Sequence, residues 1–306
     1  MQKTSTREEI TEDNLSLNTG VPTYTLLFDG DRLPLTADAL QVINVETAKE
    51  AADYLRLLGN SCELHISEEY RSAHFDIEAT IRTLCSTNHI DEPPFDTETA
   101  AALIRKLPLD LKSLIKSNLR LKDGDKLPPL IKKELVHKTS NANVLISEPF
   151  STGWLHYFNM FQETTELTFD HPSEHVQGLL ISEALRQVGI ACAHLQGLSP
   201  EGKLVLLNYN TNFYRFIERN EPILLRAYTG FSENESSEDK NASFYIQVLQ
   251  WGRVCADSVI TTFACLRIER QKQLNKRLEK IESRNKSHFE SKVNKVLELE
   301  SASRCV

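Results

Sequence analysis

The sequence of 306 residues lacks any apolar run long enough to cross a membrane, and its first twenty residues are mostly polar. A membrane-spanning helix needs about 20 predominantly apolar residues. A secretory signal needs a basic start followed by an apolar stretch. The sequence shows neither pattern, so we expect no membrane span and, by default, a cytoplasmic location.

Positive charge is also in short supply. Lysine and arginine number 35 against 43 acidic residues, which gives a formal net charge of −8. A protein whose main partner is a nucleic acid or an anionic membrane generally presents a basic surface. The balance of charge therefore argues against both as the main partner of the whole chain.

No two cysteines are spaced as C-x-x-C. The chain has six cysteines, and most of them lie inside apolar runs. Zinc sites and redox motifs use closely spaced pairs. The spacing instead predicts reduced thiols in the core, and we expect neither a metal nor a cofactor.

What the sequence does contain is enough apolar material, 40% of its residues, for one large or two modest globular domains. Hydrophobic patterning divides the chain into four parts. They are a flexible arm at 1–22, a small α/β unit at 23–130, a strand-rich domain at 136–268 and an amphipathic helix at 269–306. In the small unit we predict strands at 24–28 and 62–66 and helices at 46–58, 77–84, 97–106 and 110–121. No motif assigns this unit a role.

The strand-rich part has β-branched and aromatic runs separated by turn signals. We predict strands at 144–146, 154–161, 164–169, 204–207, 213–217, 223–229, 244–250 and 254–266, with a polar surface loop at 232–241. A long apolar helix, 178–195, lies among them. One central helix wrapped by an antiparallel sheet is the hotdog arrangement, so the predicted fold class is α+β with a hotdog domain.

The central helix carries a polar cluster on an apolar background. Spacings of three and four residues bring Glu183 beside Arg186 and Gln187, and Ser182 beside Arg186. A buried carboxylate and guanidinium are costly unless they pair, so such a cluster indicates a functional site. We expect burial to raise the pKa of Glu183, which would allow it to act as a general acid or base.

The segment before and within this helix resembles two families of hotdog enzymes. In hydroxyacyl-carrier-protein dehydratases a Gly precedes the catalytic Glu by five positions, as Gly178 precedes Glu183 here. A closer resemblance is to the A-factor biosynthesis hotdog family, the γ-butyrolactone autoregulator synthases. The matching elements are Asp170-His171-Pro172, Glu174-His175-Val176, Gly178, Glu183-Ala184 and Arg186-Gln187. The resemblance covers about 130 of the 306 residues.

The resemblance implies roles for three residues of the helix. Gly178 would let a thioester carbonyl approach the helix start, where free N–H groups stabilise an oxyanion. Glu183 would be the catalytic acid or base. Arg186 would either keep Glu183 ionised or bind the phosphate of a co-substrate such as dihydroxyacetone phosphate.

Three more residues complete the expected site. Gln187 would contribute to substrate binding. His171, on the turn before the helix, would be the catalytic partner for proton transfer, and His175 would be the reserve candidate and a substrate-binding residue.

We therefore expect an acyltransferase that moves a β-ketoacyl group from an acyl-carrier-protein or CoA thioester onto a small hydroxylated acceptor. The alternatives are a hydroxyacyl-thioester dehydratase or thioesterase, or a non-catalytic acyl-binding module. A lone hotdog unit normally pairs with a twin, so the resemblance also implies a homodimer through residues 136–268.

The tail differs from the rest in charge. Over residues 267–304, eleven lysines and arginines face six acidic residues, a net charge of +5, and an apolar stripe includes Leu274, Leu278 and Ile281. This pattern is typical of a helix that packs on its own subunit or on a twin. The other interpretation is a docking surface for an acidic partner such as an acyl carrier protein.

Overall fold

The computed structural model describes residues 24–33, 41–86, 93–109, 119–122, 124, 126, 128–167, 173–199, 201–233, 239–265 and 268–303. The arm predicted at 1–22, most of the helix predicted at 110–121, and His171 lie outside the described residues. Within the described ranges, none of the helices is both long and apolar enough to span a membrane.

The N-terminal unit contains a three-stranded parallel sheet in the order β2-β1-β3. The side chains of Thr47 and Asp96 cap α1 and α4 by accepting hydrogen bonds from first-turn N–H groups, which satisfies donors that a helix start otherwise leaves unpaired. The strands are β1 (Tyr24–Phe28), β2 (Val42–Val45) and β3 (Cys62–His65); the helices are α1 (Ala48–Leu58), the short 3₁₀ helix η2 (Gly59–Ser61), α2 (Glu68–Ala73), α3 (Ile77–Cys85) and α4 (Thr97–Lys106).

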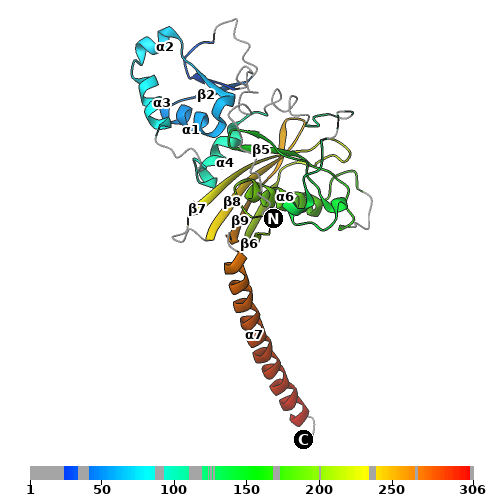
Figure 1. Cartoon of the computed structure of the whole chain (residues 1–306). Coiled ribbons are helices and arrows are strands. Elements are labelled where there is room, and N and C mark those ends of the chain that lie inside the picture. The colour runs from blue at the N-terminus through cyan, green and yellow to red at the C-terminus, as the bar shows by residue number, and fades with distance from the viewer. Residues whose placement is uncertain are drawn as a thin grey trace, which may run out of the picture.

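The second sheet is antiparallel, with six strands in the order β4-β5-β7-β8-β9-β6. It curves around the long helix α6 (Figure 1). The arrangement confirms the predicted hotdog architecture. The strands are β4 (Phe150–Thr152), β5 (Leu155–Asn159), β6 (Lys203–Phe213), β7 (Leu224–Glu233), β8 (Asp239–Gln250) and β9 (Arg253–Cys265), and the helices are η3 (Lys133–Val136), η4 (Asn141–Asn143) and α6 (Gly178–Leu195).

The inner face of this sheet buries α6. Leu185 and Val188 of the helix share one core with Phe244 and Ile246 of β8, and all four are completely buried. Each fully buried side chain of this kind contributes about 1.5–3 kcal/mol. This core therefore fixes the helix, and with it the polar cluster, against the sheet.

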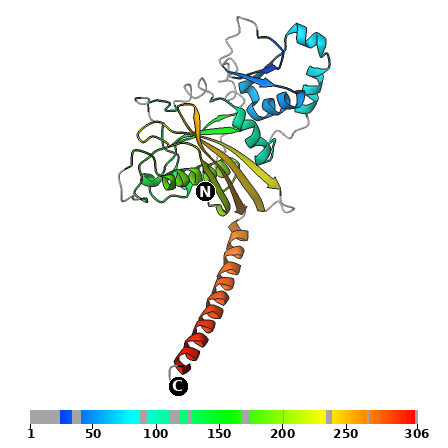
Figure 2. The same ribbon diagram turned by 180° about the vertical axis from the view of Figure 1, so that it is seen from behind.

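The outer face is covered by the N-terminal unit (Figures 1 and 2). Tyr24 and Leu57 belong to the same core as Tyr157 of β5 and Tyr228 of β7. The turn between β4 and β5 meets the end of α1 so closely that a Cβ on Gly153 would lie 2.4 Å from the carbonyl oxygen of Leu57. The N-terminal unit and the hotdog domain are thus packed as one body.

Arg226 of β7 lies in this interface and is 1% exposed. It donates hydrogen bonds to the carbonyl oxygens of Leu107 and Pro108, at 3.1 and 2.9 Å, and to Oε1 of Gln247. The last carbonyls of a helix lack partners within the helix and carry partial negative charge. Arg226 therefore satisfies the end of α4 and ties it to the sheet.

Four predictions about the strands were wrong in detail. Residues 144–146 form no strand and contribute only an isolated bridge from Ile146 to Met160. Residues 164–167 form no strand, and the single strand β6 replaces the two strands predicted at 204–207 and 213–217. The loop predicted at 232–241 is shorter, because β7 runs to Glu233 and β8 begins at Asp239. Hydrogen-bonded pairing between β8 and β9 continues as far as Asp239 and Cys265. This pairing extends β8 into polar sequence.

The last described element is α7 (Ile268–Ser303), which leaves the end of β9 and projects away from the rest of the chain (Figures 1 and 2). It covers residues 269–303 of the helix predicted at 269–306, and the last three positions lie outside the described residues. The apolar residues of its stripe lie on a surface that no other described element covers.

Candidate functional site

The site is built around the first three turns of α6. The carbonyl oxygen of Gln177 accepts hydrogen bonds from the N–H groups of Leu180 and Ile181, at 3.0 and 3.1 Å. The N–H groups of Gly178 and Leu179 have no hydrogen-bond partner in the part of the chain that the structure describes. Both residues are exposed, so the helix starts with two N–H donors that can bind a ligand.

Gly178 is not required by the packing of the chain itself. A Cβ at this position would lie 3.6 Å from Cζ of Phe213, an ordinary van der Waals contact. The backbone there is not in the left-handed region that favours glycine. An alanine would therefore fit at position 178 without strain, and the fold alone does not explain the glycine.

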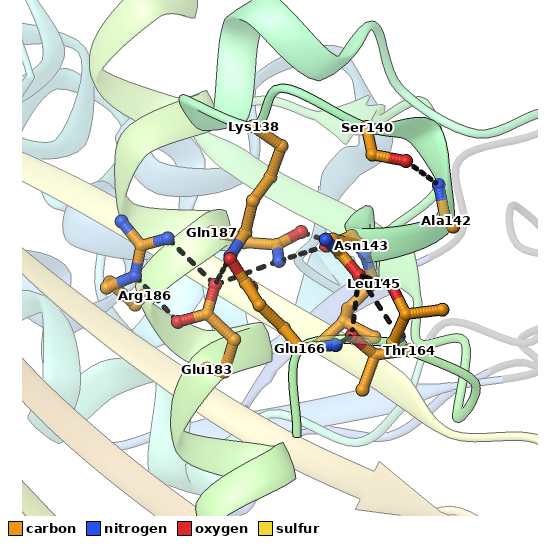
Figure 3. A network of polar contacts seen from close by, with 11 residues as sticks. Lys138, Ser140, Ala142, Asn143, Leu145, Thr164, Glu166, Glu183, Arg186 and Gln187 are labelled. Carbon is orange, nitrogen blue, oxygen red and sulfur yellow. Dashed lines mark hydrogen bonds and ion pairs between the residues drawn. The ribbon is translucent and has the colours of Figure 1, made fainter. Parts of the chain in front are cut away.

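The carboxylate of Glu183 is the centre of a polar network (Figure 3). Arg186 donates to both of its oxygens, from Nε and from a terminal nitrogen, at 2.7 Å each. Gln187 Nε2 donates to Oε1 at 3.0 Å, and Lys138 Nζ lies 2.9 Å from the same atom. Oε1 therefore receives three donors and Oε2 receives one.

The expected direction of the pKa of Glu183 was wrong. Burial acts to raise this pKa and is the largest single influence, but hydrogen bonds from Arg186, Gln187 and Lys138 act together in the opposite direction and lower it to about 2. A carboxylate with several charge-assisted donors is stabilised in its ionised form. Arg186 contacts both oxygens of Glu183, as expected if it keeps this carboxylate ionised. Its expected role towards a phosphate stays a prediction.

Lys138 is a member of the site that the sequence reasoning did not assign. Its side chain is 7% exposed, and its amine lies between the carboxylates of Glu166 and Glu183 (Figure 3). A buried ammonium is costly unless it is paired. Lys138 lies 45 positions before Glu183, in the segment between η3 and η4, so no local spacing links the two residues.

Gln187 is completely buried, and its amide is fully used by the chain. Its Nε2 donates to the carbonyl oxygen of Asn143 at 2.9 Å as well as to Glu183, and its Oε1 accepts from the N–H of Leu145 at 2.8 Å. Gln187 thus fastens α6 to the segment that follows η4 and orients the carboxylate.

Of the two candidate histidines, the structure describes only His175. His171 is outside the described residues, so its expected role stays a prediction. The ring of His175 stacks on that of Phe216, with centroids 4.4 Å apart. Its Nδ1 atom is buried and has no hydrogen-bond partner among the residues described.

His175 also lines a cavity of about 650 Å³ beside the start of α6. Leu130, Phe161 and Leu180 contribute to an apolar wall, while Arg219 is a charged residue of the lining. The remaining lining residues are Asn141, Ala142, Val144, Gln162, Glu163, Thr164, Thr165, Leu167, Val176 and Gln177. A volume of this size is typical of small-molecule sites.

The polar network adjoins this cavity. Asn143, which is held by Gln187, accepts hydrogen bonds through Oδ1 from the hydroxyl groups of Thr164 and Thr165 in the cavity wall. Arg219 forms no ion pair with any residue described. Within the described ranges, no group of three or more His, Cys, Asp or Glu side chains is placed to hold a metal ion.

The edge of the sheet carries an apolar surface. Strand β6 is an edge of the sheet, and Val205, Leu206 and Leu207 on it are each about half exposed. Leu179 of α6 is 67% exposed. Exposed apolar edge strands are uncommon in monomers because they tend to pair with other chains.

Comparison with known proteins gives a family match in the central part of the chain. Residues 120–266 match the family model described as the A-factor biosynthesis hotdog domain. This match confirms the resemblance inferred from the segment 170–187. No curated protein matches the chain.

Several solved structures are similar to part of the chain. A mutant thioesterase from Pseudomonas aeruginosa is 16% identical, over 47% of this chain and 98% of its own, with a TM-score of 0.34. An uncharacterized protein from Pyrococcus horikoshii is 12% identical, over 45% and 95%, with a TM-score of 0.31. A thioesterase family protein from Silicibacter pomeroyi is 18% identical, over 40% and 84%, with a TM-score of 0.28. Similarity at this level supports no conclusion about substrate.

Proposed function

We propose that the hotdog domain binds an acyl thioester and transfers its acyl group to a small hydroxylated acceptor. The observation that carries this proposal is the pair of N–H groups of Gly178 and Leu179 at the start of α6, which have no partner among the described residues and lie beside a cavity of about 650 Å³. The match of residues 120–266 to the A-factor biosynthesis hotdog domain supports the same substrate class.

The helix start supplies the electrostatic part of the reaction. The partial positive charge of the helix dipole and the two N–H donors would stabilise the oxyanion that forms when the thioester carbonyl is attacked. The cavity, with apolar residues such as Leu130, Phe161 and Leu180, would hold the acyl chain. Loss of one such oxyanion donor typically costs a factor of about 100 or more in rate.

The ionised state of Glu183 favours transfer over dehydration. Eliminating water from a hydroxyacyl group needs an acid to protonate the departing hydroxyl, and a carboxyl with a pKa of about 2 carries no proton at neutral pH. A carboxylate can accept, and Oε2 receives only the bond from Arg186. We therefore assign Oε2 of Glu183 to hold and polarise the hydroxyl group of the acceptor.

In the proposed reaction the acceptor oxygen forms a bond to the thioester carbon, the carbon–sulfur bond breaks, and the hydroxyl proton ends on the departing thiolate. We assign this proton transfer to His175, which lines the cavity and whose Nδ1 has no hydrogen-bond partner among the described residues. His171 is the alternative carrier implied by the motif. Arg219, free of ion pairs among the described residues, would bind a phosphate such as that of dihydroxyacetone phosphate.

The proposed functional unit is a homodimer paired through β6. The exposed apolar side chains on this edge and Leu179 on α6 would be covered by the same surface of a second copy. Mass measurement in solution tests this directly. In a chain that ends at Cys265, so that α7 cannot hold copies together, Leu206→Asp on β6 should halve the mass, whereas Phe75→Asp, an equally apolar and more exposed site in the N-terminal unit, should not.

The activity is tested by incubating the full chain with β-ketoacyl-CoA and β-ketoacyl-pantetheine thioesters, with and without dihydroxyacetone phosphate, and identifying products by mass spectrometry. We expect an acyl ester that appears only with the acceptor. Glu183→Gln should abolish it, while Glu201→Gln, on an exposed carboxylate beyond α6, should not. With β-hydroxyacyl thioesters, an enoyl product without acceptor would establish a dehydratase. Free acid would establish a thioesterase, and binding without any turnover would reduce the domain to an acyl-binding module.

A further inference from the structure

Helix α7 exposes a long apolar surface. It is 36 residues long and projects alone from the end of β9 (Figures 1 and 2). Exposed side chains include Ile281 at 55%, Phe289 at 67% and Val296 at 54%. A helix is stabilised mainly by burying its apolar face. An uncovered face of this length therefore indicates a missing partner.

The spacing of these residues is that of a coiled coil. We define the apolar stripe of α7 as Leu274, Leu278, Ile281, Asn285, Phe289, Val293 and Val296. The first four are separated by four, three and four residues, as in a heptad repeat. Two successive spacings of four then follow, which is a single local insertion of the kind that coiled coils tolerate.

The two flanks of the stripe carry opposite charges. Arg277 and Arg284 directly precede stripe residues and lie on one flank. Glu279 and Glu282 directly follow stripe residues and lie on the other. Lys286 is an exception on the acidic flank, and its amine is 3.9 Å from Glu290 of the same helix.

The distribution of charge on the two flanks indicates both the partner of α7 and the relative direction of the two helices. When two copies of a helix pair in parallel, the flank of one faces the opposite flank of the other, so Arg277 meets Glu282 of the second copy. In an antiparallel pair each flank faces itself, and the arginines would repel one another. Asn285, in the middle of the stripe, is the type of residue that fixes the register of parallel pairs.

We infer that α7 forms a parallel two-stranded coiled coil with α7 of a second copy of this chain. An anionic membrane fits the stripe less well, because Glu279 and Glu282 would face its lipid headgroups. The surface is separate from β6, so the pairing does not depend on the proposed dimer or on the proposed activity.

The first experiment measures the mass of the full chain in solution against that of a chain that ends at Cys265, before α7. Both chains also carry Leu206→Asp, which removes the β6 pairing, so any remaining association comes from α7. We expect removal of α7 to lower the mass at least twofold. In the Leu206→Asp chain that keeps α7, Ile281→Asp should have the same effect, and Ser283→Asp, on the opposite face of the helix, should have none. Without Leu206→Asp, a truncated chain that is itself a dimer retains the β6 pairing; a truncated monomer would refute that pairing and leave the coiled coil standing.

The second experiment tests direction. Arg277→Glu should weaken self-association by about tenfold, because an attractive pair becomes a repulsive one on both sides. Adding Glu282→Arg should restore it. In a Cys305→Ser background, Ile281→Cys and, separately, Val296→Cys should each form a disulfide between copies. A parallel register places every stripe position beside its own copy, whereas an antiparallel pair can do so at only one position.

The inference is overturned if the mass is unchanged by removal of α7, or if the charge reversal is not rescued and positions 281 and 296 do not both cross-link. Cosedimentation with vesicles of phosphatidylserine and phosphatidylcholine provides the competing outcome. Binding that requires α7, without any change of mass, would assign the helix to a membrane surface instead.

Discussion

The ionised Glu183 makes a quantitative prediction about stability and pH. Its pKa falls from an ordinary value of 4.5 to about 2 in the folded chain. One pKa unit corresponds to 1.36 kcal/mol, so this carboxylate contributes about 3 kcal/mol of folding free energy at neutral pH. Because the folded pKa is the lower one, the contribution is present above about pH 5 and is lost as the pH falls towards 2. About 2 kcal/mol of it should be gone by pH 3.

The assay is urea unfolding followed by circular dichroism at pH 7, 4 and 3. Other carboxylates also have lowered pKa values, among them Asp31, Glu50 and Asp96, so the chain as a whole loses stability in acid. Subtracting the free energy of unfolding of the Glu183→Gln variant from that of the wild-type chain isolates the contribution of Glu183. The stability difference between the wild-type chain and Glu183→Gln should shrink by about 2 kcal/mol between pH 7 and pH 3.

Glu69→Gln, on the exposed surface of α2, is the matched control and should show no such change. A difference between wild type and Glu183→Gln that stays constant with pH would refute the reasoning. It would mean that Glu183 is not held ionised by its three donors, and the argument that favours transfer over dehydration would fall with it.

Three further substitutions test other parts of the structure. Lys138→Met should destabilise the chain by about 3 kcal/mol, because Glu166 and Glu183 lose their buried partner, and should raise the pKa of Glu183; urea unfolding and its acid dependence measure both. Gly178→Ala should leave the melting temperature nearly unchanged but lower thioester turnover about tenfold or more, as measured by product formation. Arg226→Met should cost about 3 kcal/mol in calorimetry, because the end of α4 loses its donors.

Much of the fold could be predicted from local patterns. The strand at 24–28 and the helices 97–106 and 178–195 follow from apolar periodicity and capping residues, and they appear at those positions or within one residue of them. The edges of β6, β7 and β8 could not be predicted, because hydrogen bonds to β9 extend them through polar residues whose own preference for strands is weak.

The packing of the N-terminal unit on the hotdog sheet could likewise not be predicted from the sequence. Its contact with the outer face of the hotdog sheet rests on Arg226 and on the close approach at Gly153, both of which pair residues more than ninety positions apart. The local sequence around Arg226 and Gly153 does not predict which residues they contact. Contacts of this kind are decided by which faces remain apolar once each layer has formed.

The sequence alone determined that this chain carries a hotdog domain with Gly178 at the start of a helix and a Glu183–Arg186–Gln187 cluster within it, since spacings of three and four fix which side chains share a helix face. Only the tertiary structure decided the charge of Glu183. Lys138 joins the cluster from outside the helix, and with Arg186 and Gln187 it outweighs the cost of burial. A pKa depends on every donor within reach in three dimensions, so no pattern along one helix predicts its direction.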